Sequence, residues 1–298
     1  MRNWWIVFAL SGFILRAQPK ISFTFDDGTT KDRGGYALEE WNNMLLGKLE
    51  SEGIQATLFA TGYDKADSIG NYLLSSWDLK GHSIGNHTYT HPNFNSEKTS
   101  LKLFKEELIR TDILISRYEN YVKLFRFPYL KEGNVKEKVD GFRSFLDSMG
   151  YKNGYVTVDA SDWYIDSRLR KRLKSDPASD LKGFRDFYVT HLYERACFYE
   201  MLSYKLTGRH INHTLLLHHN LAAALFIDAL MEKFKSEGWE LISSDHAFSD
   251  PIFNEVPDYA GESLIWALTK DSGIYDDLLR YPAEDGKYEK EKMDELGL

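Results

Sequence analysis

Short apolar runs alternate with longer segments of helical periodicity along most of the chain. Ile21–Phe25 alternates apolar and polar positions with a period of two, which predicts a strand. Segment 98–118 instead spaces its apolar residues as one face of a helix does. On the same grounds we expect further strands at 56–60, 123–127, 155–158, 214–217 and 239–242, and helices at 38–51, before Gly81, at 135–149 and at 221–237. Residues 83–85 are ambiguous.

This alternation of strands and helices predicts the α/β class, with a parallel sheet closed or nearly closed into a barrel. The pattern is interrupted once, because no strand signal is present between Trp163 and Asn212. We interpret residues 164–212 as a helical insertion in the barrel, so that 18–275 would form one catalytic domain. Residues 276–298 are rich in charge and are expected to form a C-terminal tail whose last residues are poorly ordered.

The first seventeen residues have the layout of a secretory signal peptide. Arg2 precedes an apolar run from Trp4 to Leu15, and Ala17 supplies a small residue before a cleavage point. The run is short for a transmembrane span, so we expect no stable membrane anchor after cleavage of residues 1–17. The protein is therefore predicted to be secreted or periplasmic; the alternative is a buried N-terminal segment.

Composition excludes one class of partner and leaves another open. The 298 residues carry a net charge of −8, which argues against a nucleic-acid partner. Aromatic residues make up 14% of the chain, a share that suits either a core of large side chains or stacking on sugar rings. The cations clustered at 168–174 form either a solvated helix face or a contact with an anionic polymer.

Polar residues repeatedly follow the expected strands, at the end where a parallel α/β barrel assembles its site. Asp26 and Asp27 close the first strand, and two adjacent carboxylates there are costly unless a cation neutralises them. Strand alternation would point them in different directions and so suit them to two tasks. Gly28 permits the sharp turn that presents them.

A metal site is the simplest reason for this arrangement. His87 and His91 are four residues apart and, on one helical turn, would reach a single cation. Two histidines and the Asp27 carboxylate make a three-ligand set with an open position, as in catalytic metal sites. Arg126 follows a later strand and can pair with a carboxylate there.

Two further groups follow later strands. Asp162 lies in the segment DASDW, and His218 and His219 close the run LLLHH. His218 shares a strand face with Leu216, so we favour it over His219 as the histidine that acts beside Asp162.

Five motifs, TFDDG, H-x-x-x-H in NHTYTH, RFPY, DASDW and LLLH, occur in this order. In that order they resemble the polysaccharide deacetylase family (carbohydrate esterase family 4, the NodB homology domain). The resemblance covers residues 20–245 and implies a distorted barrel of the (β/α)7 type, with the helical insertion lying between the fourth and fifth motifs. It also implies an acetylated glycan as partner and a divalent metal as cofactor, usually zinc and sometimes cobalt or nickel.

Carried over residue by residue, the resemblance implies a role for each matching position. Asp27, His87 and His91 would bind the metal. Asp26 would be the general base, paired with Arg126. Asp162 would orient His218, the proton donor. The resemblance further implies that the Tyr129 N–H holds the oxyanion and that substrate-binding residues are Trp163, Leu216 and Pro128.

The leading prediction is thus removal of acetyl groups from an N-acetylglucosamine-containing glycan such as peptidoglycan, a chitooligosaccharide or a surface polysaccharide. The same residues would serve an O-acetyl (xylan) esterase or a hydrolase of another linear amide. A glycan-binding protein without catalysis is the alternative from another class. The long insertion departs from simple family members, so their substrate groove cannot be transferred to this chain.

Overall fold

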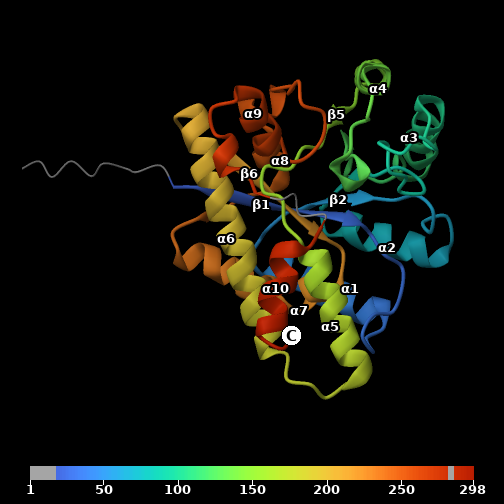
Figure 1. The fold of residues 1–298 in the computed structure, drawn as a ribbon. Helices are drawn as coiled ribbons and strands as arrows, with labels where there is room; N and C mark the ends of the chain where they lie inside the picture. Colours follow the sequence, from blue (N-terminus) through green and yellow to red (C-terminus); the bar gives the residue numbers. More distant parts are fainter. Residues whose placement is uncertain (1–17, 281–284) are drawn as a thin grey trace, which may run out of the picture.

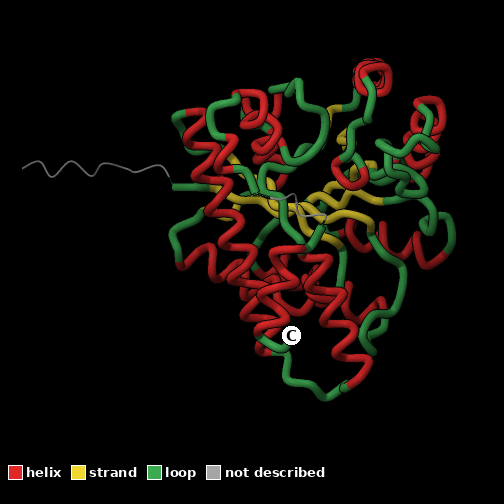
Figure 2. The backbone as a smooth tube through the Cα atoms, in the orientation of Figure 1, coloured by secondary structure: helices red, strands yellow, loops and turns green. Residues whose placement is uncertain are grey.

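The computed structural model describes residues 18–280 and 285–298; the expected signal peptide, residues 1–17, lies outside the described residues. At the centre is a parallel sheet in the order β5-β4-β3-β2-β1-β6, with β7 also pairing with β1. Figure 2 shows the strands as a central band with helices on both sides. The strands are β1 Lys20–Asp27, β2 Thr57–Ala60, β3 Ser83–Asn86, β4 Tyr121–Phe125, β5 Lys152–Asn153, β6 Asn212–His218 and β7 Glu240–Leu241.

Helices surround this curled sheet (Figure 1). The α-helices are α1 Leu38–Ser51, α2 Ser68–Leu79, α3 Leu101–Ile115, α4 Lys136–Met149, α5 Asp162–Ser175, α6 Lys182–Thr207, α7 Leu221–Ser236, α8 Ser244–Phe248, α9 Leu264–Ser272 and α10 Lys287–Glu295. Short 3₁₀ turns occur at Pro128–Leu130, Pro251–Asn254 and Asp276–Leu278. The predicted α/β class and distorted barrel are confirmed. Among the described residues, no helix combines the length and apolarity needed to span a bilayer.

Both faces of the sheet are covered, so that even the polar residues Ser22 and Thr24 of β1 are buried. All six inner residues of β1 are buried, and the main core packs α1, α6 and α7 around it. Figure 1 shows β1 crossing the middle of the molecule between these helices. The carboxyl ends of β1, β3, β4 and β6 therefore open at one edge of the sheet, which is where the site is built.

The strand expected at 155–158 is wrong in position. The fifth strand is Lys152–Asn153, and within the predicted segment only Val158 forms a bridge, to Leu215 of β6. The backbone here turns toward β6. The Thr157 hydroxyl accepts a hydrogen bond from the Thr214 N–H, and the Thr157 N–H donates to the Thr214 carbonyl, so the segment pairs irregularly with β6. This single bridge nearly closes the sheet between β5 and β6.

In the second half of the chain, the helical insertion packs together with the C-terminal segment. The helical insertion comprises α5 and the 26-residue α6, joined by a loop. The charged segment near the C-terminus does not remain a loose tail: α10 packs on the insertion, with Met293 fully buried. Glu289 pairs with His191 of α6 at 2.7 Å, and Asp294 pairs with Arg168 of α5 at 2.7 Å. Charge alone concealed this, because charged residues dominate the segment and Met293 is the fully buried apolar residue described in α10.

Candidate active site

One pocket of about 260 Å³ lies at the carboxyl edge of the sheet. Of the sequence-predicted residues it gathers Asp26, Asp27, His87, His91, Tyr129, Trp163, Leu216 and His218 in its lining. Arg126 and Asp162 are buried behind it, where they contact lining residues. Pro128 is buried and is not part of the lining. Leu130, Asp159 and Ala160 complete it; Asp159 and Ala160 belong to the DASDW motif but were assigned no role, and Leu130 was not selected from the sequence.

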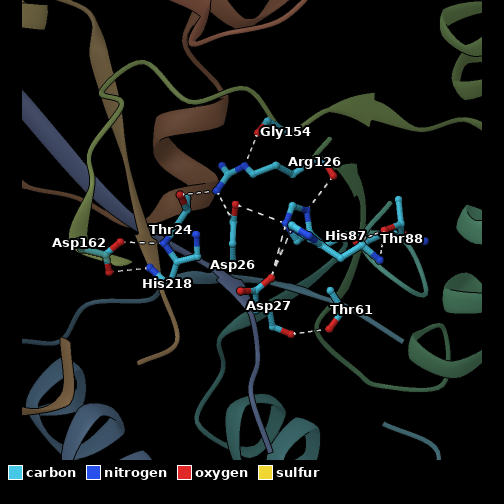
Figure 3. Close-up of polar contacts among 12 residues, drawn as sticks. Thr24, Asp26, Asp27, Thr61, His87, Thr88, Arg126, Gly154, Asp162 and His218 are labelled. Atoms are coloured by element: carbon cyan, nitrogen blue, oxygen red, sulfur yellow. Dashed lines mark hydrogen bonds and ion pairs between the residues drawn. The ribbon is translucent and has the colours of Figure 1, made fainter. Parts of the chain in front are cut away.

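Asp27 and the two histidines converge on one point, as Figure 3 shows for Asp27 and His87. The Oδ1 of Asp27 lies 3.9 Å from Nε2 of His87 and 3.7 Å from Nε2 of His91. One ligand atom from each residue lies within 4.8 Å of the other two. The three donors thus face a common space of the size that a divalent cation needs.

The two histidines reach this space from a bent loop, so the helical turn expected for them is wrong. Residues 87–91 follow β3 without helix, and Thr88 and His91 have φ values of 65° and 57°. Pro92 and the short side chain of Thr88 favour this loop, because the Thr88 hydroxyl accepts a hydrogen bond from the His91 N–H at 3.2 Å. Spacing alone could not distinguish a helical turn from such a loop.

The protonation of both histidines fits metal binding. The Nδ1–H of His87 donates to the carbonyl of Arg126 at 2.8 Å, which leaves the Nε2 lone pair directed at Asp27. Burial, helped by the neighbouring His87, lowers the pKa of His91 to about 4 and keeps its ring neutral. A neutral imidazole is the form that binds a cation. The residues present therefore fit a divalent metal.

Backbone strain is concentrated around this point. Six non-glycine residues in the described chain have positive φ; four of them, Asp27, His91, Tyr129 and Leu130, line the pocket, and Thr88 lies in the loop that carries His87 and His91. Non-glycine residues in this region cost roughly 1–3 kcal/mol each and persist where surrounding structure enforces them. The strained turns aim Asp27 and His91 inward.

Asp26, the last residue but one of β1, is almost fully buried. Arg126 Nη1 pairs with its Oδ1 at 2.7 Å and also donates to the Thr24 hydroxyl at 2.8 Å. The Arg126 Nε donates to the Gly154 carbonyl at 2.9 Å, so the guanidinium is fixed from three sides (Figure 3). The other carboxylate oxygen of Asp26 lies 3.7 Å from His87 Nε2, beside the metal position.

His218 faces the same pocket from β6. Asp162, the first residue of α5, accepts the His218 Nδ1–H at 2.7 Å and its backbone N–H at 2.9 Å. Burial opposes a charge on the ring, but attraction to Asp162, helped by Asp27 and Asp26, outweighs it and raises the pKa of His218 to about 10. The ring is therefore cationic at neutral pH.

His219 points the other way, into the core. Its Nε2 bonds the Asn42 amide at 3.0 Å, and its ring packs on Trp41 and Trp77. Burial lowers its pKa to about 3, so this ring stays neutral. The strand alternation that favoured His218 as the pocket residue agrees with this geometry.

Lys65 is a site neighbour that the sequence gave no signal for. It is 1% exposed, pairs with Asp64, and brings its aliphatic chain close to Gly28. Burial lowers the pKa of Lys65, although Asp64 and Asp27 attract its charge. Its ammonium adds positive charge behind the carboxylate of Asp27, and its position depends on the close approach of Gly70, where an added Cβ would lie 2.3 Å from the Lys65 backbone.

Comparisons with known proteins agree with this arrangement. Residues 16–153 match the family model described as polysaccharide deacetylase. The chain is 32% identical over 157 residues to the peptidoglycan-N-acetylglucosamine deacetylase of Bacillus cereus, an alignment that covers 52% of this chain and 50% of the relative. The chain thus spans about half the length of this curated relative.

Solved structures show the same fold at low identity. A variant of the peptidoglycan deacetylase PdaC from Bacillus subtilis has a TM-score of 0.51 at 20% identity, covering 77% of this chain and 90% of that one. A pseudoenzyme of carbohydrate esterase family 4 from Bacillus anthracis has a TM-score of 0.52 at 19% identity, covering 78% and 66%. Because a peptidoglycan deacetylase and a pseudoenzyme both have this fold, the fold alone does not establish activity.

Proposed function

We propose that this chain, whose residues 16–153 match the polysaccharide deacetylase family, is a metal-dependent hydrolase that removes acetyl groups from an N-acetylglucosamine-containing glycan. Peptidoglycan, a chitooligosaccharide and a surface polysaccharide are the glycans we consider. One observation carries the proposal: the Asp26 carboxylate and the cationic imidazole of His218 line the same pocket as the three-ligand cluster. Amide hydrolysis needs a base, an acid and an electrophile in this relation.

The residues that would hold the cation are Asp27, His87 and His91, with zinc as the proposed metal and cobalt or nickel as alternatives. When bound, such an ion supplies Lewis acidity and lowers the pKa of water. The protein fixes the geometry, since the Arg126 carbonyl orients His87 and the strained backbone orients His91.

Proton transfer is assigned to the two groups on either side. Asp26, held by Arg126, is placed to accept a proton from the attacking water. His218, held by Asp162, is placed to donate a proton to the leaving nitrogen. A carboxylate can accept a proton and a cationic imidazole can donate one, so Asp26 suits the attacking water and His218 suits the leaving nitrogen.

The remaining lining residues would bind the substrate. Tyr129, in a left-handed turn beside His91, is proposed to offer its N–H to the oxyanion, a contact worth about 3 kcal/mol in comparable sites. Trp163 and Leu216 present apolar surface for the acetyl methyl. Pro128, behind the lining, would contribute by fixing the turn that carries Tyr129.

We also propose that the protein acts outside the cytoplasm, after removal of residues 1–17. This rests on the sequence of that segment, with a basic start, an apolar run and a small residue. An acetylated cell-surface glycan would be accessible to the enzyme there.

Asp26→Asn tests the base assignment. We expect acetate release to fall by about 10²–10⁴-fold, because an amide cannot accept the proton. Bound metal should stay equal to that of the unaltered protein, since Asp26 is not among the three converging ligands. The control is Asp176→Asn at the far end of α5.

Acetate release would be measured on peptidoglycan, chitooligosaccharides and acetylxylan, with zinc or cobalt added. A fully active Asp26→Asn enzyme would remove the base assignment. Activity confined to acetylxylan would instead favour the esterase.

A further inference from the structure

A second cleft, of about 410 Å³, lies beside the pocket and is lined by cations. Arg33, in the loop between β1 and α1, faces Arg170 and Lys174 of α5 across it. Figure 1 shows that loop, in blue, running beside α5. Gly34 allows this loop to pack closely against α5 and α7, because a Cβ there would lie 2.6 Å from Leu221 of α7 and 2.9 Å from Leu173 of α5.

The cleft and the active-site pocket are lined by two of the same parts of the chain, α5 and the end of β1 with the loop that follows it. On α5, Trp163 lines the pocket, while Arg170 and Lys174 line the cleft. Arg170 and Lys174 follow Trp163 by seven and eleven residues, so all three lie on one side of the helix. Along the helix axis, Arg170 is about 10 Å and Lys174 about 16 Å from Trp163. In the other wall, Asp27 lines the pocket and Arg33, six residues later, lines the cleft. A linear ligand can therefore extend from the pocket into the cleft.

The charges in the cleft are not fully balanced by its acids. Among the described residues, neither Arg33 nor Lys174 forms an ion pair; Arg33 donates to the Thr29 hydroxyl at 3.0 Å. Asp32 is the acid in the lining, and its Oδ1 accepts a hydrogen bond from the Leu38 N–H at 2.8 Å.

Arg170 has a partner of its own. It pairs with buried Asp166 at 2.6 Å through Nε, and Asp166 also accepts the Ala222 N–H at 3.2 Å. The repulsion between the two arginines contributes, after burial, to a lowered pKa of Arg33. The cleft thus presents excess positive charge in a protein whose net charge is −8.

We propose that this cleft is a subsite for an anionic group, carboxylate or phosphate, carried by the glycan some distance from the acetyl group being removed. Guanidinium groups suit both anions because their N–H fork matches the two oxygens. The inference rests on the proposed function and narrows it, because it selects acidic glycans over neutral ones.

The test compares charged and neutral ligands on matched variants. Lys174→Glu reverses a charge in the cleft, and Lys171→Glu makes the same change on an exposed position of α5 outside the lining. Arg170 is left intact because its loss would strand Asp166 in the interior. The ligands are peptidoglycan fragments with free carboxylates, the same fragments with amidated carboxylates, a phosphorylated glycan and a neutral chitooligosaccharide.

Binding is measured by calorimetry and, separately, KM by acetate release. We expect Lys174→Glu to weaken binding of the carboxylated fragments about five- to tenfold, as loss of a charge-assisted contact does. Binding of the neutral glycan should change less than about twofold, and Lys171→Glu should leave both unchanged. Lys174→Arg should retain the preference. The phosphorylated glycan shows whether phosphate serves as well as carboxylate.

Equal effects of Lys174→Glu on charged and neutral ligands, or no effect on either, would overturn the subsite. The calorimetry does not depend on turnover. If acidic glycans bind with the expected preference but no acetate is released from any ligand, the subsite stands and the proposed deacetylase activity fails.

Discussion

Asp162 controls His218 through two separate contacts, to the ring and to the backbone N–H. Its second oxygen also accepts from the Asn220 amide at 2.8 Å, so the carboxylate is fixed on both sides. Because the pKa of His218 in the folded protein, about 10, exceeds its ordinary value, the folded state binds this proton more tightly than the unfolded chain. The resulting stability is present below about pH 6.5 and is lost as the pH rises toward 10.

Asp162→Asn should therefore move the alkaline limb of the pH–rate profile to lower pH. Removing the attractive charge lowers the pKa of His218, so the proton donor is lost at a lower pH. We also expect acetate release at neutral pH to fall by about 100-fold. Rates would be measured from pH 5 to 10 beside Asp176→Asn, and an unchanged alkaline limb would show that another group donates the proton.

At the scale of elements, the insertion and α10 stabilise each other through a small interface. Met293 is fully buried against the main core, whereas Met201 on α6 is 39% exposed. Met293→Ala should lower the free energy of unfolding by about 2–4 kcal/mol, and Met201→Ala by much less. Urea denaturation of both variants tests this. Equal small losses would mean that α10 does not depend on its buried methionine.

Sequence patterns located most elements but not their local geometry. Period-two alternation found β1, and a short apolar run found β6. Such patterns misplaced the fifth strand, since hydrogen bonds from Thr157 to Thr214 replaced regular pairing there. The N-terminal boundary of α3 was three residues early because the Ser100 cap, which accepts the Leu103 N–H at 3.1 Å, starts that helix.

The site was more accessible to sequence reasoning than the strands beside it. Asp26, Asp27 and His218 follow strands directly, so topology alone brings them to one edge. The sequence did not predict that Leu130 and Asp159 line the pocket, because their positions depend on a left-handed turn and an irregular loop. Residue type and spacing do not encode those backbone conformations.

For the whole molecule, the metal ligands stand apart from the parts that hold the fold together. The three hydrophobic clusters contain none of Asp27, His87 and His91, and the sheet pairs β1 with β2 and β6 along its length. We therefore expect the protein to fold without the cation, in contrast to small domains in which metal binding supplies the folding energy.

Removal of the metal should abolish activity and leave the protein folded. After treatment with a chelator, we expect an unchanged far-UV circular dichroism spectrum together with loss of acetate release. Added zinc at about 100 times its Kd should restore activity and stabilise the fold by about 2.7 kcal/mol, seen as a higher Tm. His87→Ala should lose this zinc-dependent shift in Tm, because a ligand is missing, whereas His246→Ala on α8 should keep it. Unfolding of the chelated protein would show that the site is structural, and a shift retained by His87→Ala would show that the cation binds elsewhere.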